Sequence, residues 1–264
     1  MSHHRRTALI TGASAGIGAT FARFLAAQGY DLVLVARRVE RLNELAKELN
    51  QQFGIKSYVF AADLTDKQAP TAIMAFVKEQ GVVIDMLINN AGLSGKTAFA
   101  DTPWQDLANE IQLMITAVTE LAYRVIPDMK QQGWGRIINL SSLAAFSPPG
   151  ASLLYTGIKS YVLNISESLD MELKPYGIHV TALCPGFTHS EFHDVMGTRD
   201  TANHLPAILW QQPEAVVQEG YEAVMKGKPV CVPGIVNKVI ASSMRPIPES
   251  ARYFLGKTFN PFKN

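Results

Sequence analysis

The chain has 264 residues, of which 47% are hydrophobic and 18% charged, and its formal net charge is +1. This length can bury a sizeable core in one domain, and the near-neutral charge gives no electrostatic reason to expect a nucleic-acid partner. The two cysteines have neither metal-type spacing nor the number that a disulfide framework needs, which favours a reducing, cytoplasmic compartment. We expect no signal peptide and no transmembrane segment, because no apolar run of the required length is present.

Apolar runs typical of buried strands alternate with helical patterns along most of the chain. The expected strands are residues 7–11, 31–36, 56–61, 84–89, 136–141, 178–184 and 229–232. The expected helices are residues 16–28, 38–52, 66–80, 103–131, 153–176 and 213–226. This alternation predicts an α/β fold in which helices cover both faces of a parallel sheet.

Two segments fall outside this alternation. Residues 187–212 follow a strand without a clear period, and we expect them to form a substrate lid or binding loop. The C-terminal extension, residues 235–264, is apolar with scattered basic residues, and it suits packing on the domain, contact with another subunit, or contact with a membrane surface. No repeat or low-complexity linker is present, so we expect one domain over residues 1–264.

A glycine-rich segment, residues 11–18, joins the first expected strand to the first helix and reads TGASAGIG. Glycines let the backbone turn tightly and approach a pyrophosphate, which the N-terminus of the helix then attracts. The G-x-x-x-G-x-G spacing is one residue longer than the usual dinucleotide fingerprint, and a glycine-rich turn without a ligand is the alternative. The strand before it and the helix after it favour a nucleotide site.

Two arginines follow the second expected strand. That strand ends at Ala36, where an acidic residue would bind the ribose 2′-hydroxyl of NAD. Arg37 and Arg38 come next, and the planar arginine side chain pairs with phosphate oxygens. They favour NADP(H), although NAD(H) is possible and a solvated helix face is the alternative. Asp63, after the third strand, could meet the adenine or cap a helix.

Tyr155 and Lys159 lie four residues apart, which places both on one face of the expected helix. A lysine charge beside a phenol is expected to lower the tyrosine pKa toward neutral pH, which would make Tyr155 a general acid or base. Ser142, after the strand 136–141, could hold the substrate oxygen. The pair alone is a weak signal, and its weight comes from the nucleotide loop before it.

Together these motifs resemble the classical short-chain dehydrogenases/reductases over about residues 5 to 234. The order and spacing of the family are met by residues 11–18, 63–64 and 89–92, by Ser142, by Tyr155 with Lys159, and by Pro185 with Gly186. The resemblance implies a single Rossmann-type domain with a doubly wound, seven-stranded parallel sheet. It also implies a homodimer or homotetramer.

The resemblance implies hydride exchange between a nicotinamide cofactor and a ketone, aldehyde or alcohol. Tyr155 would exchange the proton at the substrate oxygen, Lys159 would bind the nicotinamide ribose and lower the tyrosine pKa, and Ser142 would polarise the carbonyl. Besides Tyr155 and Lys159, the cofactor residues that it implies are Gly12, Ser14, Gly16, Ile17, Gly18, Asp63, Leu64, Asn90, Ala91, Gly92, Pro185, Gly186 and Thr188, to which the 2′-phosphate argument adds Arg37 and Arg38.

One position departs from the family pattern. The family has an asparagine in the long fourth helix, thirteen residues before the proline that ends it, and counting back from Pro127 gives Met114. That asparagine is thought to hold a water that links the lysine to solvent, and a thioether is a weak acceptor and no donor. We therefore expect either an enzyme with a slower proton relay or, as the alternative, a cofactor-binding sensor or scaffold with weak or no turnover.

Large apolar side chains near these motifs predict a hydrophobic ketone or secondary alcohol as substrate, and packing of the lid is an equal alternative. The candidates are Leu143, Phe146, Ser147, Pro148, Phe187, Phe192, Met196, Leu205, Leu209 and Trp210. The histidines of this region, His189, His193 and His204, lack ligand spacing, so no metal site is predicted.

Overall fold

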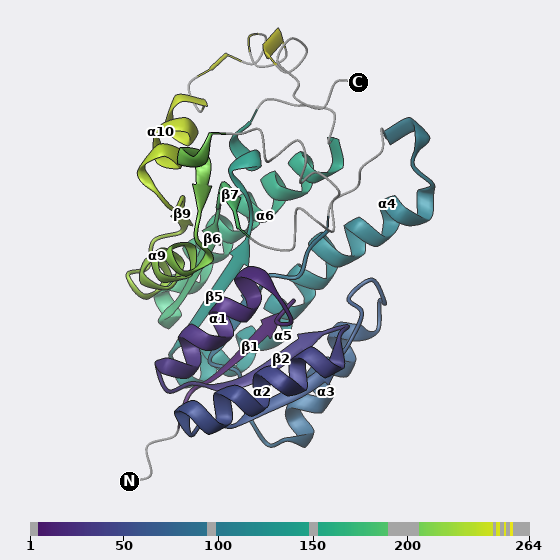
Figure 1. Ribbon diagram of the computed structural model, residues 1–264, viewed down its shortest axis with the longest axis vertical. Coiled ribbons are helices and arrows are strands. Elements are labelled where there is room, and N and C mark those ends of the chain that lie inside the picture. Colours follow the sequence, from purple (N-terminus) through teal and green to yellow (C-terminus); the bar gives the residue numbers. More distant parts are fainter. Residues whose placement is uncertain are drawn as a thin grey trace.

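A seven-stranded parallel sheet forms the centre of the molecule, in the order β3-β2-β1-β4-β5-β6-β9 (Figure 1). The computed structural model describes residues 5–93, 99–147, 153–189, 206–244, 247–248, 251 and 254–255. The strands are β1 (Thr7–Thr11), β2 (Asp31–Ala36), β3 (Ser57–Ala61), β4 (Met86–Asn89), β5 (Gly135–Leu140), β6 (Ile178–Leu183) and β9 (Val230–Cys231). The predicted Rossmann-type sheet is confirmed. Its order reverses at β1, which pairs with both β2 and β4.

Helices cover both faces of the sheet because its strands are apolar on both sides. Along β1, Ala8 and Ile10 face one core cluster and Leu9 faces the other. The first cluster is covered by α1 (Gly16–Ala27), α2 (Val39–Phe53) and α9 (Pro213–Met225), and the second by α3 (Ala69–Glu79), α5 (Ala117–Gln132) and α6 (Leu153–Leu173). Strands buried on both faces explain the nearly continuous apolar runs of the sequence.

The long helix predicted for residues 103–131 is divided into three parts. α4 (Trp104–Ile111) passes into one π-helical turn, Gln112–Thr116, before α5 begins at Ala117. Pro127 lies inside α5, which ends at Gln132, one residue beyond the predicted end of the helix at residue 131. Short π segments within helices are frequent at functional sites, and this one contains Met114.

Two short strands form a second, parallel sheet within the expected lid. β7 (Phe187–Thr188) pairs with β8 (Trp210–Gln211), and residues 190–205 between them lie outside the described part of the chain. The remaining described elements are α10 (Ile235–Met244) and 3₁₀ turns at Phe99–Asp101, Leu143–Phe146, Lys174–Tyr176 and Ala207–Leu209. Among the described residues, no helix is both long and apolar enough to cross a membrane.

Candidate active site

The site lies at the carboxyl edge of the sheet, where the ends of β1 and β4 meet. Ligands of open α/β sheets bind at the point where the strand order reverses, which here is between these strands. The Asn90 side chain donates to the Thr11 carbonyl at 2.9 Å and to the Gly12 carbonyl at 3.2 Å. The Thr11 hydroxyl in turn accepts from the backbone N–H groups of Asn90 and Ala91. These bonds fix the glycine loop against the end of β4.

The glycine loop and the start of α1 fit an anionic ligand such as a pyrophosphate. Gly12 has φ +66°, and a side chain at Gly18 would collide with the Gly12 carbonyl, so both positions need glycine. α1 begins after Ala15 with no side-chain cap and no acidic residue in its first turn. The first N–H groups of α1 and the positive end of its helix dipole therefore lie at the glycine loop, where they can attract an anion.

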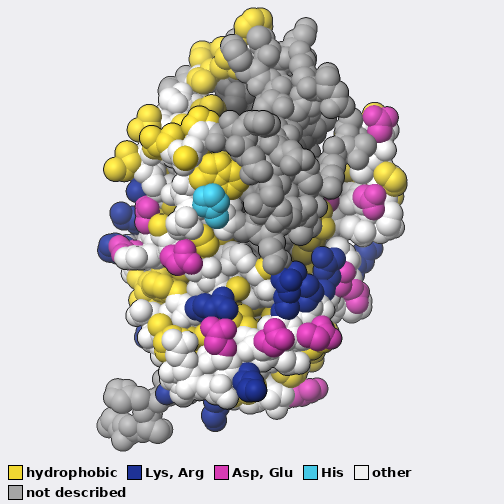
Figure 2. Space-filling view, viewed as in Figure 1, with side chains coloured by type: hydrophobic (Ala, Val, Ile, Leu, Met, Phe, Trp, Pro, Cys, Tyr) yellow, Lys and Arg dark blue, Asp and Glu magenta, His cyan; other side chains and the backbone are white. Residues whose placement is uncertain are grey.

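The two arginines after β2 lie beside this loop, near the N-terminal end of α2, where Figure 2 shows a group of basic side chains. The Arg38 guanidinium donates to the Ser14 hydroxyl at 3.2 and 3.3 Å. Arg37 is 69% exposed and lies 3.8 Å from the Asp63 carboxylate. Asp63 also accepts from the backbone and hydroxyl of Thr65, so it shapes the turn after β3 and does not cap α3, which begins at Ala69.

Several expected cofactor residues contribute backbone and not side chain to this edge. Leu64 is 5% exposed and packs in the second core cluster, and the Ile17 side chain packs against the first. Ala91 and Gly92 are half-buried beside the end of β4.

Ser142, Tyr155 and Lys159 come together between β5 and α6. Ser142 follows β5, and its hydroxyl oxygen accepts from the Ala144 N–H at 3.1 Å and shares a hydrogen bond with the Tyr155 phenol. The Lys159 ammonium lies 5.4 Å from the centre of the Tyr155 ring and donates to the Leu140 carbonyl at 2.8 Å. The three residues predicted as catalytic therefore share one location.

The protonation of this group differs from the sequence-based expectation. Burial raises the pKa of Tyr155, and the hydrogen bond with Ser142 opposes this only in part. The expectation that Lys159 lowers the tyrosine pKa is therefore wrong, because desolvation of the phenolate dominates. Lys159 is 6% exposed, and burial lowers its own pKa to about 8. At neutral pH the protein thus holds a neutral phenol beside a readily deprotonated ammonium.

Met114 lies next to this group. It is 1% exposed, and a methyl group placed on Gly92 would lie 3.5 Å from the Met114 sulfur and 4.0 Å from Lys159 Nζ. The methionine therefore occupies the neighbourhood of the lysine, as the count from Pro127 indicated. Asn109 accepts from Gln105 on an exposed part of α4 and does not replace the missing amide.

Residues 185–188, here called the Gly186 turn, leave β6 toward this group. The Pro185 carbonyl accepts from the Leu143 N–H at 2.8 Å, which connects the turn to the residue after Ser142. The buried Thr188 hydroxyl donates to the Gly186 carbonyl at 3.2 Å. The turn thus lies beside the residues that follow Ser142.

The expected substrate residues separate into two groups. Phe187 and Trp210 are half-buried with ring centroids 5.7 Å apart, and His189 stacks on Trp210 at 4.7 Å. Phe146 is 6% exposed and packs in a third core cluster, and Leu143 packs against that cluster. The side chain of Phe146 is therefore part of the core in this structure. The candidates Pro148, Phe192, Met196 and Leu205 lie outside the described residues.

Three residues with no predicted catalytic role organise this edge. Thr11 connects β1 to β4 through its hydroxyl, and Ser141 donates to the Lys159 carbonyl at 2.7 Å. Asn237, in α10, contacts the Gly186 turn from behind. The first two could have been suspected from hydroxyls at strand ends, but nothing in the sequence connects residue 237 with residue 186.

Known proteins are similar to this chain in sequence and fold. The sequence model of the short chain dehydrogenase family matches residues 6–200. A serine 3-dehydrogenase of Agrobacterium fabrum is 35% identical over 202 residues, which are 75% of this chain and 79% of that protein.

Solved structures agree with this match. A short-chain dehydrogenase from Sphingobium yanoikuyae in complex with NADPH is 33% identical, with a TM-score of 0.81 over 92% of this chain and 96% of that chain. A bulky-bulky ketone specific alcohol dehydrogenase from Comamonas testosteroni is 31% identical, with a TM-score of 0.76 over 93% of this chain and 96% of that chain. The chain belongs to the short chain dehydrogenase family and is an oxidoreductase of that family.

Proposed function

We propose that the protein is an NADP(H)-dependent oxidoreductase that interconverts a ketone or aldehyde and an alcohol, with Tyr155 as the proton-exchanging residue. The observation that carries this proposal is the meeting of Ser142, Tyr155 and Lys159 at the carboxyl edge of the sheet. The glycine loop and the Gly186 turn lie at the same edge.

The cofactor would be held from the glycine loop to the Gly186 turn. The N–H groups at the start of α1 would hold the pyrophosphate, and Arg37 and Arg38 would hold the 2′-phosphate, since arginine pairs bidentately with phosphate oxygens. When bound, the nicotinamide supplies or accepts the hydride. The relative from Sphingobium yanoikuyae, which was solved with NADPH, supports this preference.

The proton would come from the Tyr155 phenol. Because burial raises its pKa, the phenol stays protonated at neutral pH and can donate to the oxygen of a carbonyl substrate. Ser142, which already shares a hydrogen bond with Tyr155, would hold the same oxygen. Lys159, fixed through the Leu140 carbonyl, would direct its remaining N–H groups at the ribose hydroxyls.

The substrate we propose is apolar. Phe187 and Trp210 present aromatic surface beside the Gly186 turn. The relative from Comamonas testosteroni is specific for bulky-bulky ketones, which supports an apolar site, whereas the relative from Agrobacterium fabrum is named for serine, a small polar substrate. Comparing bulky apolar ketones with small charged keto acids tests this point, and preferential turnover of the keto acids would refute it.

The reaction is tested by following NADPH absorbance with a panel of ketones and aldehydes. Tyr155→Phe should lower kcat by about 10²–10⁴-fold, because it removes the proton donor. Tyr123→Phe is the matched control, since Tyr123 is 75% exposed on α5, and it should leave kcat unchanged. Equal activity of the two variants would remove Tyr155 from the mechanism.

The cofactor preference has its own test. Arg38→Ala and Arg37→Ala should each raise the KM for NADPH far more than the KM for NADH, because only NADPH carries the 2′-phosphate. Arg23→Ala is the control, since Arg23 pairs with Glu48 at an exposed position on α1. Equal effects on the two cofactors would contradict the 2′-phosphate site.

The sensor or scaffold alternative rests only on Met114. It is not favoured, because the three catalytic candidates lie together and the chain belongs to an oxidoreductase family. Tight NADPH binding without turnover of any tested carbonyl would restore it.

We keep as proposals one domain over residues 1–264, a lid at 187–212, a homodimer or homotetramer and a cytoplasmic location.

A further inference from the structure

The Gly186 turn is enclosed between two parts of the fold that are far apart in sequence. On one side, the Leu143 N–H donates to the Pro185 carbonyl. On the other side lies Asn237, which is 4% exposed in α10. A methyl group placed on Gly186 would lie 2.6 to 2.9 Å from three atoms of the Asn237 amide. The asparagine side chain therefore lies directly against the glycine, and a larger residue at 186 would require the amide to shift.

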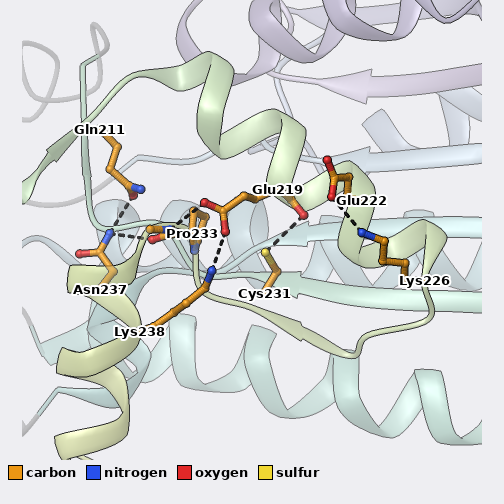
Figure 3. Close-up of polar contacts among 9 residues, drawn as sticks. Gln211, Glu219, Glu222, Lys226, Cys231, Pro233, Asn237 and Lys238 are labelled. Carbon is orange, nitrogen blue, oxygen red and sulfur yellow. Dashed lines mark hydrogen bonds and ion pairs between the residues drawn. The ribbon is translucent and has the colours of Figure 1, made fainter.

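Asn237 is itself held by two hydrogen bonds. Its Nδ2 donates to Gln211 Oε1 at 2.7 Å and to the Pro233 carbonyl at 3.0 Å, as Figure 3 shows. Gln211 belongs to β8, which pairs with β7 directly after Gly186, and its carbonyl accepts from the His189 N–H. The amide thus joins the Gly186 turn, β8 and the start of α10 in one buried contact.

A charged pair secures the far side of this contact. The Glu219 carboxylate, in α9, accepts from the Gly234 N–H at 2.9 Å and from the Lys238 ammonium at 2.8 Å (Figure 3). These bonds fix the turn between β9 and α10, and Asn237 lies in the first turn of α10. Asn237 is therefore held on one side by α9 and the turn before α10, and on the other side by Gln211 of β8.

We propose that Asn237 is a positioning residue for the nicotinamide half of the cofactor, acting through Gly186. This inference rests on the proposed function, in which Arg37 and Arg38 hold the 2′-phosphate end of the cofactor and the nicotinamide half extends to the Gly186 turn. Residue 237 lies beyond residues 6–200, over which the family model matches. A displacement of the turn would misplace the nicotinamide relative to Tyr155, and shifts of about 1 Å at reacting groups cost up to about 10²-fold in rate.

The test compares affinity for NADPH with affinity for 2′,5′-ADP, which lacks the nicotinamide, by calorimetry. Asn237→Ala should weaken NADPH binding by about tenfold through loss of its contacts, and leave 2′,5′-ADP binding unchanged. Asn237→Asp keeps the size of the side chain but turns the donor into an acceptor, and it should behave in the same way. Glu222→Ala, which removes an exposed pair with Lys226 on the same helix as Glu219, is the control and should change neither affinity.

A double-variant cycle tests the contact itself. Gly186→Ala alone should weaken NADPH binding and lower kcat, because its methyl group overlaps the amide. In the Asn237→Ala background the same change should have no further effect, since the overlapping atoms are gone. Additive effects, or equal losses for NADPH and 2′,5′-ADP in Asn237→Ala, would overturn the positioning role. A wild-type chain that binds neither ligand would instead refute the proposed function, and this inference with it.

Discussion

Replacing Lys159 by methionine should change the pH dependence of stability in a direction fixed by the site. Methionine has a similar length and carries no charge. Burial lowers the pKa of Lys159 from 10.5 to about 8, and the side chain is 6% exposed. The difference of about 2.5 between the two pKa values corresponds to about 3 kcal/mol of stability.

The direction in which the free energy of unfolding changes with pH follows from the number of protons that each state binds. Below pH 8 both the folded and the unfolded chain carry the charged lysine, and burial of that charge costs its full amount. Between about 8 and 10.5 the folded protein has released the proton while the unfolded chain still binds it, so the free energy of unfolding rises with pH. Above 10.5 both states are neutral and the cost is gone. The variant lacks this titration.

Urea unfolding of both proteins from pH 7 to 10.5 measures the effect. The free energy of unfolding of the wild-type chain, minus that of Lys159→Met, should increase by about 3 kcal/mol over this range. Taking the difference cancels the other titrating groups. Lys47→Met, at an exposed position on α2, is the control for the exchange of a lysine for a methionine. A flat difference for Lys159→Met would refute a lowered lysine pKa, and a falling one would mean that the pKa is raised.

Three further outcomes are expected. Gly18→Ala should raise the Kd for NADPH more than about tenfold and lower Tm, because its methyl group meets the Gly12 carbonyl, and an unchanged Kd and Tm would contradict the tight loop. Met114→Asn should raise kcat or shift its pH profile if proton supply beside Lys159 limits the rate, whereas no change in either would make Met114 a core residue only. Asn139→Leu should lower the free energy of unfolding in urea by about 2–3 kcal/mol, because it breaks two buried hydrogen bonds, and a loss below about 0.5 kcal/mol would contradict this.

The strands predicted from local pattern agree with the structure to within two residues at each end, whereas the predicted helix 103–131 is divided into three elements. β1 and β2 have the expected bounds, because each is a short run of apolar residues buried on both faces. Ser142, Tyr155 and Lys159 also lie together as expected, since a fixed offset within one helix and the end of the neighbouring strand determine their separation. Strand bounds and these residue spacings depend on residues close together in the chain, so they can be predicted from a single sequence.

Features that depend on the surroundings were not predictable in this way. The apolar period continues through residues 112–116, and nothing in it indicates the π-helical turn. The raised pKa of Tyr155 follows from desolvation, which depends on segments that the spacing from Lys159 does not describe. Phe146 was expected near the substrate and is packed in the third core cluster with Ala241 of α10, nearly a hundred residues away.

Lys159 and the strand beside it are joined by hydrogen bonds in both directions. The Lys159 ammonium donates to the Leu140 carbonyl, and the Ser141 hydroxyl donates to the Lys159 carbonyl. α6 is therefore fixed to the end of β5 at a lysine whose charge is costly to bury. Because this cost is present at neutral pH, the lysine is a stability liability that packing elsewhere must offset. Under the proposed function, binding of the ribose hydroxyls by its remaining N–H groups would account for the presence of this lysine.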